Sequence, residues 1–314
     1  MSITSHISQS SAGRLAAAAA VAIFALATAT PGRAAYGWPV KPFHQQHPVR
    51  GFFGDPRIAG PGGSKSTIHF GIDIAAPDGT PVYATIDGSA WIHPLHSDTV
   101  IVSGAAGVSL EYWHVVPAIR PGQHVTAYQS IVGHVERPWA HVHFSERLGS
   151  VDLNPLRPGA LTPYSDRTKP TVHVINFERD GTPVGARVSG LVDLVAEAFD
   201  TAPLAVPAPW HGKPVSPAFV EWRLVGVRGS SSWHVAADFR YAYPRVPFSA
   251  IYAQWTRQNH PWGRGGTGRY RFVLSRAWNT RGVPDGIYRL VVSARDTAGN
   301  VGRAERTLVI ANNV

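Results

Sequence analysis

The sequence predicts an all-β protein with two domains, and three observations support that prediction. Short apolar and β-branched runs follow one another from residue 69 onward, separated at regular intervals by turn pairs such as Asp78-Gly79, Asp87-Gly88 and Pro121-Gly122. No helical periodicity competes with this pattern. The chain has 314 residues and is 44% hydrophobic, enough for about two domains that each bury their own core.

The amino end predicts a secretory signal peptide over residues 1–34. A polar stretch ends in Arg14, and an Ala-rich apolar run follows from Leu15 to Ala29. At about fifteen residues, this run falls short of the ~20 that a membrane-spanning helix needs. Cleavage after Ala29 or Ala34 would satisfy a small-x-small rule, and we favour Ala34; an uncleaved anchor is the alternative. We therefore expect a secreted, extracellular or cell-envelope protein with no integral membrane segment after signal cleavage.

Composition narrows the kinds of site and partner. The chain has no cysteine, which excludes a disulfide framework and a thiolate metal site. Its net charge is +9 and its pI is about 10.1, values that suit nucleic acid or another polyanion. Because a secreted protein meets anionic envelope polymers instead, we expect no nucleic-acid partner.

The first domain is expected over residues 36–163 as an antiparallel, curled β-sheet with its site on one face. A lead-in with Pro and His runs to Arg50, and a Gly- and Ser-rich loop ending at Ser66 is a candidate cleft border. The expected strands are 72–75, 81–86, 89–92, 99–102, 109–115, 124–125, 130–134 and 141–145.

His69 and Asp73 place an imidazole and a carboxylate four residues apart. In a straight strand their Cα atoms would lie ~13 Å apart, too far to share one ion. Gly71 and the β-branched residues around it disfavour a helix, which would bring the two together. Because glycine lacks a Cβ and permits a bend, we predict a strand that bends at Gly71.

His141 and His143 are two apart, so a strand would point both imidazoles to the same face. His114 lies between these motifs in the sequence. Zinc binds imidazole nitrogen and carboxylate oxygen, and a catalytic zinc keeps three protein ligands and one open position. Two His and one Asp would suffice, leaving two His to move protons. Spacing alone leaves open which of His141 and His143 binds the metal.

Four motifs occur in a fixed order: 69–84 (HFGIDIAAPDGTPVYA), 112–114 (YWH), 121–125 with 131–133, and 141–144 (HVHF). Together they resemble the lysostaphin/LytM-type zinc metalloendopeptidases, which cut peptide cross-links in bacterial peptidoglycan and whose catalytic domain is called the duplicated hybrid motif domain. The resemblance covers about residues 48 to 157. It implies one zinc ion bound by His69, Asp73 and His143, with His114 and His141 as the catalytic pair.

The implied function is a secreted peptidoglycan hydrolase whose substrate is a cross-link peptide. One of His114 and His141 would take the proton of the attacking water and pass it to the leaving amine, and the other would stabilise the oxyanion. Acidification through the His range near pH ~6.5 is then expected to lower activity. The alternative is a catalytically silent protein that binds the wall or activates amidases. The segment 136–140 departs from the Gly/Ser/Thr-rich loop common in the family, which affects the expected cleft shape.

The second domain is expected over residues 170–314 after a linker at Ser165 to Lys169. Its alternating strands are spaced as in a Greek-key sandwich, and the expected runs are 171–177, 188–199, 218–225, 270–274, 286–295 and 307–310. Residues 285–300 resemble the closing hairpin of bacterial immunoglobulin-like domains. Wall-polymer contact through this domain is a further expectation. Two long insertions, 203–217 and 244–268, are candidate recognition surfaces.

The remaining polar and aromatic candidates receive structural interpretations. His93 and His96 are expected at an exposed hairpin end, and Asp55 and Arg57 are expected to be structural rather than catalytic. His124 and His134 are expected at the surface or as satisfied core residues. Three aromatic residues are open to either a cleft or a core position: Tyr83, Trp113 and Trp139.

Overall fold

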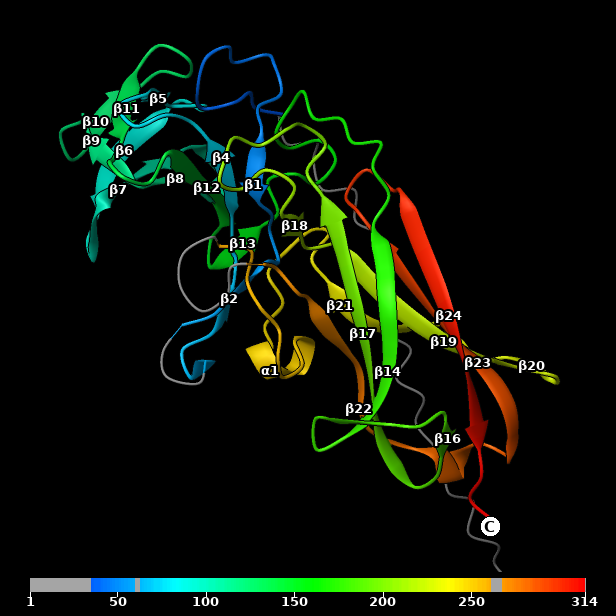
Figure 1. Ribbon diagram of the computed structural model, residues 1–314. Helices are drawn as coiled ribbons and strands as arrows, with labels where there is room; N and C mark the ends of the chain where they lie inside the picture. The colour runs from blue at the N-terminus through cyan, green and yellow to red at the C-terminus, as the bar shows by residue number, and fades with distance from the viewer. Residues whose placement is uncertain (1–34, 60–62, 261–266, 314) are drawn as a thin grey trace, which may run out of the picture. The chain divides into compact units, whose positions relative to one another are not determined.

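A computed structural model describes residues 35–59, 63–260 and 267–313 of the chain (Figure 1). The predicted signal peptide, 1–34, lies outside these described residues. The described chain is nearly all β-structure, as predicted, apart from the one-turn helix α1 (Phe248–Ile251) and short 3-10 turns. In this part of the protein, no helix is long and apolar enough to cross a membrane.

The N-terminal region, residues 36–163, is built on an eight-stranded antiparallel sheet within the described chain. The strands follow the order β1-β4-β12-β8-β7-β6-β10, and β13 pairs with the far end of β12. Figure 1 shows β4, β12 and β8 side by side in this sheet. The strands are β1 (Val49–Gly51), β4 (Ile72–Ala75), β6 (Gly88–His93), β7 (His96–Ser103), β8 (Val108–Trp113), β10 (Gln123–Val125), β12 (His141–Leu148) and β13 (Val151–Leu153).

Two small sheets complete this region. One has the order β5-β11-β9, from β5 (Pro81–Tyr83), β11 (Ile131–Val135) and β9 (Val115–Pro117). The other pairs β2 (Pro56–Arg57) with β3 (Thr67–Ile68). The single strand predicted over 109–115 is in fact two strands, because His114 adopts a positive φ of 61° and the chain changes sheets there.

The core of the N-terminal region explains why β12 presents its histidines together. Val142 and Phe144 are fully buried against Ile72 and Ile74 of the neighbouring strand. Side chains alternate along a strand, so His141 and His143 face the opposite side of the sheet. Burying each of these aliphatic and aromatic groups contributes about 1.5–3 kcal/mol, which fixes the register.

The C-terminal region, residues 170–314, contains two sheets among its described residues. One has the order β15-β14-β17-β18, with β22 on the other side of β17. The second has the order β16-β24-β23-β19-β20, with β21 also paired to β19. All pairings are antiparallel except that of β16 with β24. The resemblance to an immunoglobulin-like domain stays a prediction.

The strands of the C-terminal region match the predicted runs with shifted ends. The run predicted over 188–199 divides into two strands at the positive-φ residue Gly190. The strands are β14 (Thr171–Arg179), β15 (Thr182–Val184), β16 (Arg187–Val188), β17 (Leu191–Thr201), β18 (Pro214–Val215), β19 (Phe219–Gly226), β20 (Gly229–Ser230), β21 (His234–Asp238), β22 (Arg271–Asn279), β23 (Gly286–Arg295) and β24 (Val301–Ile310).

The two regions pack into one compact unit from residue 34 onward. The backbone N–H of Ser216 donates to the buried Asp55 Oδ1 at 2.6 Å, and the Tyr252 hydroxyl donates to the Gly54 carbonyl at 2.5 Å. Asn154 Nδ2 donates to the Phe239 carbonyl at 2.8 Å. The insertions of the C-terminal region supply Ser216 and Tyr252, so these insertions pack directly against the segment that holds Gly54 and Asp55 in the N-terminal region.

Candidate functional site

Strand pairing brings the two halves of the predicted metal site together. Asp73 on β4 lies opposite His143 on β12, and His69 precedes the bend at Gly71 that the sequence predicted. A Cβ on Gly71 would lie 2.7 Å from His143 Nε2 and 2.6 Å from the Phe144 carbonyl oxygen. Only glycine therefore lets the bent segment approach β12 this closely.

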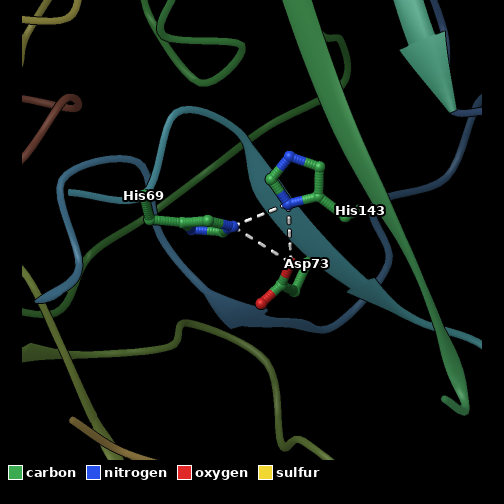
Figure 2. A group of neighbouring side chains, drawn as sticks. All are labelled: His69, Asp73 and His143. Carbon is green, nitrogen blue, oxygen red and sulfur yellow. Dashed lines mark hydrogen bonds and ion pairs between the residues drawn. The ribbon is translucent and has the colours of Figure 1, made fainter. Parts of the chain in front are cut away.

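Three donor atoms from these residues converge, as Figure 2 shows. His69 Nε2 lies 2.7 Å from His143 Nδ1 and 3.1 Å from Asp73 Oδ1. His143 Nδ1 lies 3.0 Å from the same carboxylate oxygen. All three side chains are buried. Within the His-x-His pair, His143 is the member that lies in this group of converging atoms.

The chemistry of this donor set fits zinc. Two imidazole nitrogens and one carboxylate oxygen are typical zinc donors, and a tetrahedral ion with bonds of ~2.1 Å would separate its ligand atoms by ~3.4 Å. The observed separations of 2.7–3.1 Å need only a small expansion. Neighbouring groups hold the donors: His69 Nδ1 donates to the Phe52 carbonyl at 2.8 Å, and Arg57 donates to Asp73 Oδ2 at 2.8 Å.

The protonation states of His69 and Asp73 also suit a metal. Burial, together with the nearby charge of Arg57, lowers the pKa of His69 to about 3. Burial alone would raise the pKa of Asp73, but His69, His141 and Arg57 outweigh it and hold that pKa well below its usual range. The imidazole is therefore neutral and the carboxylate ionised at neutral pH, the forms that bind metal.

The other two predicted histidines lie next to one another beside the donor group. The His114 and His141 rings have centroids 4.8 Å apart, and His114 stacks on Trp139 at 4.3 Å. The positive φ of His114 turns its side chain out of the strand direction. Burial lowers the pKa of both imidazoles; at His141, the charge of Arg50 adds to this effect.

Polar partners orient the imidazole rings of both histidines. His114 Nδ1 donates to Asp98 Oδ2 at 3.2 Å. Arg50 Nη2 lies 2.6 Å from His141 Nδ1 and 3.3 Å from its Nε2, and the Trp139 carbonyl lies 2.8 Å from Nδ1. His141 Nε2 lies 3.5 Å from Asp73 Oδ1. The two imidazoles are thus oriented by partners of opposite charge.

A cavity of about 270 Å³ opens over the donor group. Trp113 and Trp139 line it, whereas Tyr83 packs against Phe43 instead. Trp210 and His260 also line it, and each comes from one of the two long insertions of the C-terminal region. The Trp210 ring covers the Arg50 guanidinium at 3.6 Å, a cation–π contact.

Sequence reasoning missed Arg50, Trp210 and His260 as lining residues. Proline and tryptophan in the insertions were the only signal, and that signal pointed to the segments rather than to these side chains. Arg57, predicted to be structural, contacts Asp73 directly. His93 and His96 pack their rings against Trp113, at 5.4 and 4.8 Å, as part of the β6–β7 hairpin end.

Comparison with known proteins places this site in a family. Residues 67–155 match Peptidase family M23. No curated protein matches the chain. Similar solved structures include a zinc-containing peptidase from Vibrio cholerae, which is 24% identical over 39% of this chain and 39% of that chain with a TM-score of 0.33. A mutant catalytic domain of the prophage-encoded M23 protein EnpA from Enterococcus faecalis is 28% identical over 33% and 82% of the two chains, with a TM-score of 0.27.

The structure of LytU is 23% identical over 36% of this chain and 84% of that chain, with a TM-score of 0.29. The matched segment 67–155 holds the donor group of His69, Asp73 and His143 as well as His114 and His141. Residues 67–155 of this chain are therefore a peptidase domain of family M23.

Proposed function

We propose that this protein is a secreted, zinc-dependent metalloendopeptidase that hydrolyses peptide bonds in peptidoglycan cross-links. The observation that carries the proposal is the convergence of His69, Asp73 and His143 at a cavity that also exposes two further histidines. His69 Nε2, Asp73 Oδ1 and His143 Nδ1 would hold one zinc ion. When bound at such a site, zinc makes water nucleophilic near neutral pH and polarises the scissile carbonyl.

We assign His114 as the general base. The Asp98 carboxylate can only accept a hydrogen bond, so it fixes the proton of His114 on Nδ1. The Nε2 lone pair then remains free to take the proton of an attacking water and return it to the leaving amine. Stacking on Trp139 keeps the ring in this orientation.

We assign His141 as the hydrogen-bond donor to the developing oxyanion. Burial lowers the pKa of Arg50 to about 10, so its guanidinium is still protonated at neutral pH and can only donate. His141 Nδ1 cannot both accept from Arg50 at 2.6 Å and donate to the Trp139 carbonyl at 2.8 Å. We assign the lone pair to Nδ1 because the contact with the charged guanidinium is the shorter and stronger of the two, and this assignment places the proton on Nε2. A donor aimed at the charge that forms in the transition state typically contributes a factor of ~10² to 10³.

Aromatic side chains shape the cavity for an extended, uncharged segment of a peptide. Trp113, Trp139 and Trp210 line it, and Phe70 packs on the His143 ring at 4.9 Å. Aromatic surfaces exclude water, and they can contact the peptide planes and small side chains of a substrate that carries no charge at this point. The C-terminal region is proposed to contact wall polymer beyond the cleft.

The decisive experiment compares metal content with hydrolysis for three variants of the full chain. His143→Ala removes a metal donor, so both zinc occupancy and hydrolysis of purified peptidoglycan are expected to drop. His114→Ala and His141→Ala keep the donor group, so zinc should stay near one per chain while hydrolysis falls on the order of a hundredfold or more.

Zinc retention by His143→Ala together with zinc loss from His141→Ala would reverse the assignment within the pair. A wild-type protein that binds zinc but cleaves neither purified walls nor defined muropeptides would support the alternative, a silent wall-binding or amidase-activating protein.

A further inference from the structure

A second buried cluster lies far from the peptidase motifs, where the linker meets the C-terminal region. Asp166, Asp200 and Asp296 each offer a carboxylate oxygen, and these oxygens all lie within 4.8 Å of one another. Their side chains belong to residues that are 7%, 1% and 3% exposed. Three carboxylates at this distance repel strongly in a site that excludes water.

Among the described residues, none of the three carboxylates forms an ion pair with a Lys, Arg or His, and the groups that act on Asp200 and Asp296 are neutral donors and the other acidic residues of the cluster. Their hydrogen bonds come from neutral donors. Thr168 donates to Asp166 from its backbone N–H at 2.8 Å, and Asn300 donates to Asp296 from its backbone N–H at 2.8 Å and from Nδ2 at 2.6 Å. Such donors leave a large part of the negative charge uncompensated.

Asp200 gives an independent sign of a missing ligand. Its Oδ1 accepts from the Thr201 N–H at 2.8 Å, but its Oδ2 is buried and has no hydrogen-bond partner among the described residues. A buried carboxylate oxygen without a partner is costly unless something binds it. Burial, with the nearby charges of Asp166 and Asp296, raises the pKa of Asp200 to about 8.

We propose that Asp166, Asp200 and Asp296 bind a calcium ion that fastens the linker to the C-terminal region. Calcium prefers six to eight hard oxygen ligands and tolerates irregular geometry, so three carboxylates with nearby carbonyls and waters suit it. Zinc would seek imidazole or thiolate, and the cluster has neither. Magnesium demands a near-ideal octahedron and gives up its waters reluctantly.

The three carboxylates come from separate segments, which gives the ion its structural effect. Asp166 belongs to the linker at 165–169, Asp200 lies at the end of β17, and Asp296 directly follows β23. Hydrogen bonds already run between these segments: Asn300 Nδ2 donates to the Asp166 carbonyl at 3.0 Å. The ion would add bonds that hold the linker against the end of the C-terminal region.

The test measures calcium binding to the full-length protein after chelation and reloading with one equivalent of zinc, which keeps the peptidase site filled. We expect calcium to raise the midpoint of thermal unfolding on the order of 5 °C at about a hundred times its Kd. Terbium should luminesce through excitation of Tyr164, whose hydroxyl lies 3.2 Å from Asp166 Oδ2, and calcium should quench that signal by displacement.

Asp200→Asn keeps the shape of the side chain and removes its charge. This variant should lose the calcium shift and the terbium signal. It should be at least as stable as the calcium-free wild type, in which Asp200 must either bear its charge beside two other carboxylates or take up a proton. Asp180→Asn is the matched control, since Asp180 lies in the exposed turn between β14 and β15. It should respond to calcium as the wild type does.

Three results would overturn the proposal. One is the absence of any calcium shift or terbium signal in the zinc-loaded wild type at up to about 10 mM, beyond the range of extracellular calcium modules. Another is an Asp200→Asn variant that keeps the full shift, which would place the ion elsewhere. The third is an equal shift with magnesium, which would reject calcium as the selected ion.

Discussion

Replacing Arg50 with methionine tests the role assigned to His141. The substitution keeps an unbranched apolar stem in the buried position and removes the guanidinium, which lies 2.6 Å from His141 Nδ1. Without this donor, the Trp139 carbonyl at 2.8 Å becomes the only hydrogen-bond partner of Nδ1 among the described residues, and it would pull the proton to that nitrogen. His141 Nε2 would then carry a lone pair where the mechanism needs a proton.

The size of the effect follows from the kind of hydrogen bond that is lost. A bond to a charged group contributes about 1.5–3 kcal/mol. At ~1.4 kcal/mol per factor of ten, Arg50→Met should lower kcat/KM by a factor of about 10 to 150. Zinc content should not change, because Arg50 has no hydrogen bond to the three donor residues. The lost cation–π contact with Trp210 costs about 0.5–2 kcal/mol.

In the wild type, the Arg50 nitrogens Nε and Nη1 are buried and have no hydrogen-bond partner among the described residues, which is itself unfavourable. Removing them offsets the loss of the cation–π contact, so we expect little change in the unfolding temperature. The assay is kcat/KM on a defined muropeptide, measured beside zinc content and thermal unfolding. Arg50→Lys is the control that keeps the charge but loses the planar fork and the stack on Trp210. Full activity of a folded, zinc-loaded Arg50→Met variant would refute the assignment of the His141 proton to Nε2.

Four further predictions concern pH, the C-terminal insertions and the linker. Because burial lowers the pKa of His114 and His141, the acidic limb of kcat/KM should lie below pH 6.5, lower than the sequence alone suggested; a limb at or above 6.5 would contradict this. His69 has a pKa of about 3 in the folded protein and ~6.5 in the unfolded chain, so between these values the unfolded state binds one more proton. The free energy of unfolding of the chelated protein should therefore fall by up to ~1.4 kcal/mol for each unit by which the pH is lowered from 6.5 towards 3, as measured by denaturant titration. Trp210→Ala should raise KM for cross-linked substrates more than it alters zinc content, and unchanged KM would remove Trp210 from the substrate path. Residues 36–163 alone should bind zinc and keep some hydrolysis of small peptides, with lower thermal stability than the full chain, whereas a folded but inert fragment would mean that the C-terminal region completes the site.

The residues that share a strand or a turn are the ones that sequence reasoning placed correctly. Period-two alternation predicted that His141 and His143 share a face, and the unsuitability of Gly71 for a helix predicted the bend that brings His69 to Asp73. The shared face of the two histidines and the bend at Gly71 depend on residues close in the sequence and on the pairing of β4 with β12. The same reasoning missed the end of β8 at His114, because a positive φ in a histidine leaves no mark in the hydrophobic pattern.

Contacts between distant segments were beyond what the sequence could predict. Trp210 meets Arg50 across 160 residues only because the insertions pack against the lead-in, and no spacing rule connects the two positions. The same holds for the cluster of Asp166, Asp200 and Asp296, whose members belong to three segments that meet only in the folded chain. Pattern and resemblance thus predicted three donor residues that do lie together in the fold, whereas the charged and aromatic residues around them required the tertiary structure.

The contribution of Trp210 and His260 to the cavity has a consequence for the order in which the chain is made. A chain emerging from its amino end presents all four motif histidines and the motif aspartate by residue 143, but the cavity acquires its last described lining side chain only at residue 260. The Arg50 guanidinium likewise has no aromatic cover until residue 210 has been synthesised and folded. All three residues of the donor group are therefore synthesised well before the last described residues that line the cavity, so these lining side chains join the cavity only late in synthesis.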